Sequence, residues 1–140
     1  MMIKPHQLLV RIYFEDTDSG GIVYYANYFK YAERARTELL SFLGIESQQM
    51  MHEFGLGLAV RRCHAEYLKP AVLDDQVMVQ TELEKVGGAS IELRQVVVRG
   101  ADELVQISVK LGCINFESGR PVALPENLRN ALNTQMNATL

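Results

Sequence analysis

The chain has 140 residues, of which 48% are hydrophobic and 22% are charged, and its formal net charge is -3. This length fits one domain over residues 1–140 with its own hydrophobic core. The slight negative charge, without a long basic run, argues against non-specific binding to nucleic acid through phosphates. No apolar run reaches the length of a membrane span, and the short run at 8–10 is broken by Arg11. We therefore expect no signal peptide, no membrane insertion and a cytoplasmic location.

The first two predicted elements are a strand and a long helix. A strand is predicted over residues 7–15, because apolar side chains alternate there with more polar ones. The residues expected on its buried face are Leu8, Val10, Ile12 and Phe14. Over residues 25–43 the apolar positions recur at steps of three and four, which predicts a helix that Gly44 ends. Its apolar stripe includes Tyr25, Tyr28, Phe29, Ala32, Ala35, Leu39 and Phe42.

The rest of the chain is predicted to be mostly strands. A short helix is expected over 46–54 and another over 126–132. Between them, alternating patterns predict four strands, over 58–68, 77–84, 91–99 and 105–113. Gly87-Gly88 marks a hairpin between the second and third of these four strands. The alternation in 91–99 drifts near Gln95, which suggests a bulge there.

This order of elements predicts an α+β fold. One strand, a long helix and four strands joined mostly by tight turns make an antiparallel sheet with a helix on one face. One helix cannot cover every apolar surface and edge of such a sheet. We therefore expect a homodimer or homotetramer.

The cysteines and histidines show no metal-ligand spacing. Cys63 and Cys113 both fall in predicted strands, which favours inert buried thiols. His6, His52 and His64 are scattered and are interpreted as structural or surface residues. We expect no metal site and no cofactor.

The stretch from Glu15 to Tyr28 is the main candidate for chemistry. Two close aspartates, Asp16 and Asp18, are followed by a Gly-Gly pair and then by the aromatic-rich helix. Glycine lets backbone approach a ligand closely, and a helix start offers unpaired N–H groups. A carboxylate beside such groups combines a base or nucleophile with an oxyanion hole, which suits acyl transfer. The alternative is that the two aspartates only cap the turn or the helix.

The same stretch carries a family resemblance. The pattern Asp16-x-Asp18-x-x-Gly21-x-Val23-x-Tyr25-x-x-Tyr28 resembles the signature of the 4-hydroxybenzoyl-CoA thioesterase family of hotdog folds. The longer runs over 13–38 and 67–75 are most similar to its YbgC branch of bacterial acyl-CoA thioesterases, which are associated with the Tol-Pal cluster. The resemblance implies a long central helix wrapped by a five-stranded antiparallel sheet, dimers that join their sheets, and an acyl-CoA substrate.

The resemblance also implies roles for the residues of the signature. Asp18 matches the catalytic aspartate and would attack the thioester carbonyl or activate a water, two routes that stay open. The oxyanion donor would be the backbone N–H of Tyr25, while Gly20 and Gly21 keep side chains out of the acyl path. Many YbgC-like sequences have histidine where this chain has Tyr25, so a mechanism that needs that histidine cannot operate here. Asp16 is expected to be structural, holding the loop through backbone N–H groups.

Further residues are candidates for substrate binding. Tyr24 and Tyr28 could line an acyl pocket, although tyrosines at helical spacing are more often core or interface residues. Arg61 and Lys85 are candidate contacts for the phosphates of CoA. Ser90 lies where relatives place a turn near the nucleotide. The acyl group of the substrate could be short and aliphatic or aromatic. Its carrier could be CoA or an acyl carrier protein.

Three functions compete at this point. The leading hypothesis is an acyl-CoA thioesterase that releases a free acid and CoA. A hotdog dehydratase is expected to need a histidine near the helix start, and the chain has none between His6 and His52. The third hypothesis is a scaffold that binds acyl carrier protein, or is associated with Tol-Pal, and has little turnover.

Overall fold

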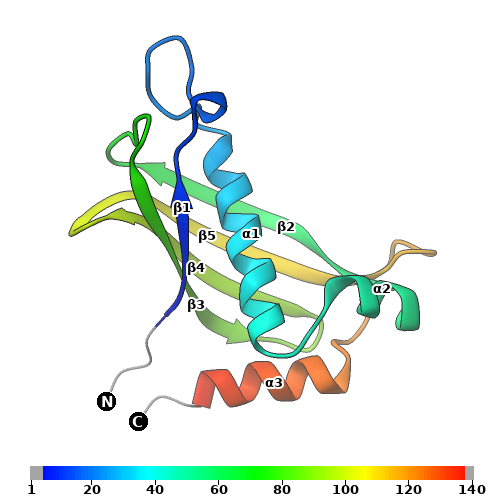
Figure 1. Cartoon of the computed structure of the whole chain (residues 1–140). Helices are drawn as coiled ribbons and strands as arrows, with labels where there is room; N and C mark the ends of the chain where they lie inside the picture. The colour runs from blue at the N-terminus through cyan, green and yellow to red at the C-terminus, as the bar shows by residue number, and fades with distance from the viewer. Residues whose placement is uncertain (1–4, 138–140) are drawn as a thin grey trace.

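The computed structural model describes residues 5–137 as five strands, three helices and one 3₁₀ turn (Figure 1). In chain order these are β1 (His6–Arg11), η1 (Phe14–Asp16), α1 (Asn27–Phe42), α2 (Ser47–Phe54), β2 (Leu56–Tyr67), β3 (Gln76–Val86), β4 (Ser90–Arg99), β5 (Asp102–Asn115) and α3 (Glu126–Asn137). All eight predicted helices and strands are therefore present, with shifted ends.

The strands form one antiparallel sheet in the order β1-β3-β4-β5-β2. Figure 1 shows the sheet curving around α1, with α3 beyond the C-terminal end of that helix. The predicted α+β architecture, a long helix wrapped by a five-stranded antiparallel sheet, is confirmed. Among the described residues, no helix is long and apolar enough to cross a membrane.

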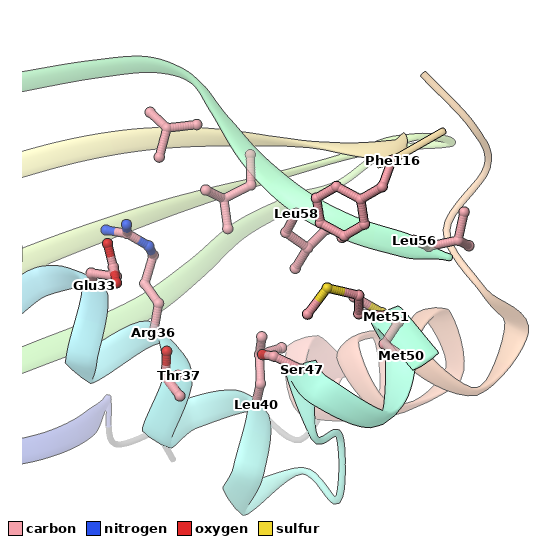
Figure 2. Close-up of a pocket in the computed structure, with 13 residues that line it drawn as sticks. Glu33, Arg36, Thr37, Leu40, Ser47, Met50, Met51, Leu56, Leu58 and Phe116 are labelled. Carbon is pink, nitrogen blue, oxygen red and sulfur yellow. The ribbon is translucent and has the colours of Figure 1, made fainter. Parts of the chain in front are cut away.

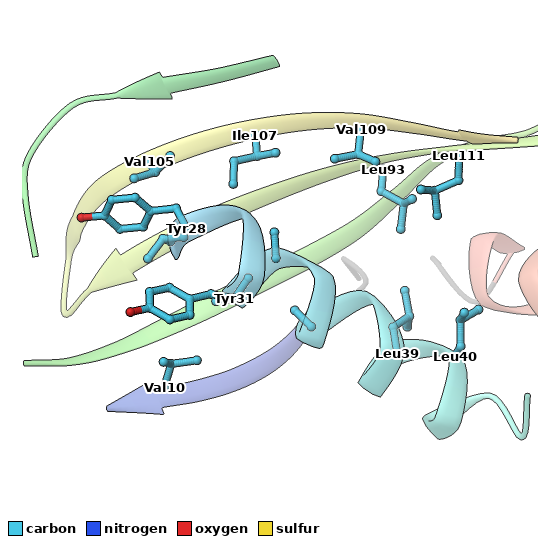
Figure 3. Packing of buried hydrophobic residues seen from close by; sticks show 14 of the residues in the cluster. Val10, Tyr28, Tyr31, Leu39, Leu40, Leu93, Val105, Ile107, Val109 and Leu111 are labelled. Atoms are coloured by element: carbon cyan, nitrogen blue, oxygen red, sulfur yellow. The ribbon is translucent and has the colours of Figure 1, made fainter. Parts of the chain in front are cut away.

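The core lies between α1 and the concave face of the sheet (Figure 3). Ala32 and Ala35 are fully buried on α1, and their small side chains let the helix lie close to the strands. The buried strand residues that face it include Val77, Val79, Val105, Ile107 and Val109, at predicted alternating positions, and Leu93 and Val97 of β4. The alternation predicted these strands well because a sheet with one covered face separates apolar and polar side chains.

Gln95 faces this core, and the bulge predicted near it lies two residues further along β4. The register of Gln95 itself is regular, opposite Thr81 on β3 and Ile107 on β5. The side chain is completely buried, and its Nε2 donates to Ala32 O at 2.9 Å and to Thr81 Oγ1 at 3.0 Å. The apparent drift in the pattern comes from this inward-facing polar residue, while the irregularity of β4 lies at Val97/Val98.

The first strand is shorter than predicted. β1 ends at Arg11, and residues 14–16 form η1, which leaves Phe14 79% exposed instead of buried. The cause is local, because the Asp16 carboxylate accepts the Tyr13 N–H at 2.8 Å and winds the chain into a turn. Asp16 thus has the structural role that was predicted for it.

Other predicted burials are also wrong. Of the predicted apolar stripe, Phe42 is 70% exposed, Phe29 is 37% exposed, and Tyr25 is 57% exposed and precedes α1. Cys113 is buried as predicted, but Cys63 is exposed. Cys63 lies on β2, an edge strand that pairs with β5 alone among the described strands.

We predict that the protein is at least a dimer, because one edge of the 12-residue strand β2 is unpaired among the described residues. Exposed apolar side chains on this strand, such as Val60 and Tyr67, also need cover. Light scattering at micromolar concentration should give at least twice the mass of the 15.8 kDa chain. A single 15.8 kDa species at all concentrations contradicts the prediction.

Candidate active site

The candidate catalytic residues lie on the loop that joins β1 to α1. The Asp18 N–H donates to Ile22 O at 2.8 Å, and the Tyr24 N–H donates to Asp16 O at 2.9 Å. These bonds pair the two arms of the loop as a short antiparallel hairpin, with Gly20 near its tip. We call residues 16–24, which carry the candidate catalytic residue Asp18, the catalytic loop.

The Asp18 side chain is exposed on this loop, and only one of its carboxylate oxygens is used by the turn. Oδ1 accepts the Gly20 N–H at 2.8 Å. Within residues 5–137 no group donates a hydrogen bond to Oδ2. Asp18 is therefore a turn residue that still presents a free carboxylate oxygen, so the structural and catalytic interpretations are compatible.

Glycine is required at positions 20 and 21 for different physical reasons. A Cβ on Gly20 would lie 3.2 Å from Asp18 Oδ1 and crowd the carboxylate. Gly21 has a φ of 81°, in the left-handed region that other residues rarely adopt. The Gly-Gly pair thus shapes the loop around the Asp18 carboxylate.

The start of α1 is tied to the catalytic loop. Asn27, the first residue of α1, donates through Nδ2 to Asp16 O at 2.8 Å and through its N–H to Tyr24 O at 2.9 Å. Tyr25 follows Tyr24 directly, and its N–H has no acceptor in the part of the chain that the structure describes. An unpaired N–H at a helix start is free to stabilise an oxyanion.

Tyrosine rings line a cavity beside this helix start. The ring centroids of Tyr24 and Tyr25 are 4.8 Å apart, and Tyr67 of β2 lies 6.1 Å from Tyr25 and 5.9 Å from Tyr28. The cavity has a volume of about 240 Å³. Its lining consists of Ile22, Val23, Tyr25, Tyr28, Tyr67, Leu68, Lys69 and Pro70.

The predicted pocket tyrosines differ in their surroundings. Tyr28 is buried in the core as well as lining the cavity, and its hydroxyl accepts the Ala71 N–H at 3.0 Å. Burial raises the pKa of Tyr28 and also that of Tyr67, so both hydroxyls stay neutral at pH 7. Tyr24 is exposed and is not part of the cavity wall.

The predicted CoA contacts do not gather at Asp18 within one chain. Arg61 is the extra residue at a bulge in β2, and its side chain lies over Gly112 of β5, where a Cβ would be 2.7 Å from Arg61 Cδ. Lys85 and Ser90 flank the β3–β4 turn, which lies near α3 and away from the catalytic loop (Figure 1). α1, of 16 residues and about 24 Å, lies between that turn and Asp18. These three residues remain predictions.

A larger groove of about 370 Å³ lies between α1, α2 and β2 (Figure 2). Its walls are mainly apolar, with Leu40, Met50, Leu58 and Phe116 among them. Arg36 reaches into it from α1 while its Nη1 donates to Gln95 Oε1 at 3.0 Å. Glu33 is the one carboxylate of its lining, and neither Asp18 nor Tyr25 belongs to that lining.

Comparison with known proteins decides the family. The thioesterase-like superfamily matches residues 12–132 of the chain. The chain belongs to this superfamily. An acyl-CoA thioesterase YbgC from Haemophilus influenzae is 40% identical over 122 residues, which cover 87% of this chain and 90% of that protein. An acyl-CoA thioester hydrolase YbgC from Escherichia coli O6:H1 is 38% identical over 120 residues, covering 85% of this chain and 89% of the relative.

Solved structures agree with this assignment to the thioesterase-like superfamily. A probable thioesterase from Bartonella henselae superposes with a TM-score of 0.83 at 31% identity, covering 86% of this chain and 99% of that one. A 1,4-dihydroxy-2-naphthoyl-CoA thioesterase from Synechocystis gives a TM-score of 0.85 at 18% identity, covering 91% and 95%, and supports the fold alone. The predicted YbgC-like hotdog fold and the predicted enzyme class, a thioester hydrolase, are confirmed.

Sequence reasoning missed Tyr67 as a member of the candidate site. Tyr67 ends β2, 42 positions after Tyr25, and the two rings meet at 85°. The available signal was the run over 67–75, which carried part of the family resemblance but no assigned role. Because ring contacts between distant segments depend on the sheet register, local patterns could not reveal this one.

Proposed function

We propose that the protein hydrolyses acyl-CoA thioesters to a free acid and CoA, with Asp18 as nucleophile or general base. One observation carries the proposal. In the part of the chain that the structure describes, the loop between β1 and α1 presents an Asp18 carboxylate oxygen and a Tyr25 N–H that have no hydrogen-bond partner, and Tyr25 lines a cavity together with Tyr28 and Tyr67. The names of the YbgC relatives support acyl-CoA as the substrate.

Two routes are consistent with this arrangement. In the first, an Asp18 oxygen attacks the thioester carbon, the C–S bond breaks, and the thiolate of CoA leaves and takes up a proton; water then hydrolyses the resulting anhydride. In the second, Asp18 accepts a proton from a water that attacks the same carbon, the C–S bond breaks, and the thiolate of CoA leaves and takes up that proton. In both, the carbonyl oxygen becomes negative and is stabilised by the Tyr25 N–H. A backbone donor does not depend on the histidine that this chain lacks at position 25.

The cavity favours small acyl groups. At about 240 Å³ it is smaller than a site for a drug-sized ligand, and its walls are aromatic and aliphatic. A short aliphatic or a single-ring aromatic acyl group is therefore the proposed substrate class. An acyl carrier protein remains an alternative carrier to CoA, and a scaffold with little turnover remains the alternative function.

Free-thiol release by the purified protein tests this function. We expect turnover of short or aromatic acyl-CoA thioesters, and faster turnover than of the matching acyl-pantetheine thioesters. The advantage of CoA should shrink as salt is raised, because screening weakens contacts to its phosphates. No turnover of any acyl thioester would leave the scaffold as the better hypothesis.

Variants of the predicted phosphate contacts sharpen the same assay. Arg61→Gln and Lys85→Gln should reduce the preference for CoA and leave turnover of the pantetheine thioester unchanged, because pantetheine carries neither the pyrophosphate nor the 3′-phosphate. Equal rates for the two carriers at every salt concentration would contradict a nucleotide site.

A further inference from the structure

The connection between β2 and β3 holds the catalytic loop by its backbone. We call residues 70–75 the anchor turn. Its Ala71 O accepts the Val23 N–H at 2.9 Å, which fixes the returning arm of the catalytic loop. At the other end, Asp75 O accepts the Ile12 N–H at 2.9 Å and Ile12 O accepts the Asp74 N–H at 3.1 Å. The chain is therefore bound to the anchor turn both before and within the catalytic loop.

The anchor turn is itself held by one short ion pair. Arg99, the last residue of β4, donates through Nη1 to Asp75 Oδ2 at 2.6 Å and to Pro70 O at 3.3 Å. The same Asp75 oxygen accepts the Val72 N–H at 2.9 Å. Arg99 thus joins both ends of the anchor turn to the central part of the sheet.

This ion pair differs from its neighbours in burial. The side chains of Asp75 and Arg99 are 19% and 35% exposed, whereas those of Arg11 and Asp74 are 53% and 72% exposed. Burial raises the pKa of Asp75, but the Val72 N–H and Arg99 together lower it by more, so the carboxylate is ionised at neutral pH. The exposed Arg11–Asp74 pair, at 3.3 Å, is expected to contribute little.

We propose that Asp75 and Arg99 are positioning residues, whose ion pair sets where the anchor turn holds the loop that carries Asp18. The inference rests on the proposed function of Asp18. Neither Asp75 nor Arg99 touches the reacting atoms in this arrangement; they act through Ala71, Val23 and the hairpin pairing of the catalytic loop. Because a displacement of about 1 Å at a reacting group can cost about 100-fold in rate, the anchor should affect turnover more than substrate binding.

The test compares Arg99→Met, Arg99→Lys and Asp75→Asn with Arg11→Met as the matched control. Arg99→Met should lower kcat about 10- to 100-fold with KM changed less than about threefold. Asp75→Asn keeps the acceptor for the Val72 N–H but loses the charge. Its kcat should therefore lie between those of Arg99→Met and the wild-type protein. Arg99→Lys restores a cation and should recover part of the rate. Arg11→Met removes an ion pair to the same turn and should leave kcat unchanged.

Hydrogen exchange supplies a readout that does not depend on turnover. Amides of the catalytic loop should exchange faster in Arg99→Met than in wild type or Arg11→Met, while β4 and β5 keep their protection. If the wild-type protein hydrolyses no thioester, the proposed function fails and exchange alone decides whether the anchor exists. Unchanged exchange of the loop in Arg99→Met and Asp75→Asn, or a loss of kcat in Arg11→Met equal to theirs, overturns the proposal.

Discussion

Replacing Asp18 with asparagine should lower kcat by about 10²–10⁴, the usual contribution of a general base, or by more if Asp18 is the nucleophile. Asparagine keeps the oxygen that accepts the Gly20 N–H, so the turn should survive. It removes the negative charge, and with it both proposed routes. KM should change less, because substrate binding comes mainly from the rest of the acyl-CoA molecule. Steady-state kinetics by thiol release measure both constants.

Asp16→Asn is the matched control for Asp18→Asn. The Asp16 carboxylate accepts the Tyr13 N–H, and asparagine keeps an accepting oxygen but loses the charge that strengthens this bond, so the change should affect stability more than turnover. A folded, oligomeric Asp18→Asn protein whose kcat stays within about threefold of wild type contradicts the assignment. Glu33, in the groove of Figure 2, and Glu66 on β2 would then be the next carboxylates to test.

Gln95→Leu should lower the free energy of unfolding by about 1–3 kcal/mol. Leucine is similar in size to glutamine, so the loss comes from polar groups left without partners. Thr81 Oγ1 and the backbone O of Ala32 both lose the donor Nε2, and Arg36 loses its acceptor Oε1. At this chain length the melting temperature should fall by about 4–12 °C, measured by circular dichroism at one fixed protein concentration.

Gln106→Leu is the matched control for Gln95→Leu. Gln106 lies on β5 with its side chain on the outer face, where it donates to Glu103 Oε1 at 2.7 Å in an exposed hydrogen bond. Its replacement should change the free energy of unfolding by less than about 0.5 kcal/mol. Equal effects of the two substitutions would show that the buried network around Gln95 does not stabilise the contact between α1 and the sheet.

The alternation of apolar and polar residues predicted strands correctly where one face of the strand is buried and the other is exposed. The strands over 77–84 and 105–113 were predicted because one face meets α1 and the other does not. The pattern failed at Phe14, where a hydrogen bond from Tyr13 to Asp16 ends the strand early. It also failed at Gln95, because a satisfied polar side chain in the core looks like an exposed one in the sequence.

The sequence by itself identified the candidate residues of the catalytic loop, because they lie close together in the chain. Asp18, the Gly-Gly pair and the helix start follow one another within 10 residues, so their bonds need no distant partner. Only the tertiary structure decided what surrounds the loop. Tyr67 reaches the cavity, and Arg99 reaches Asp75 in the anchor turn, through sheet pairing between segments far apart in the chain. Which distant residues meet depends on strand order and register, and a pattern of single residues does not contain that information.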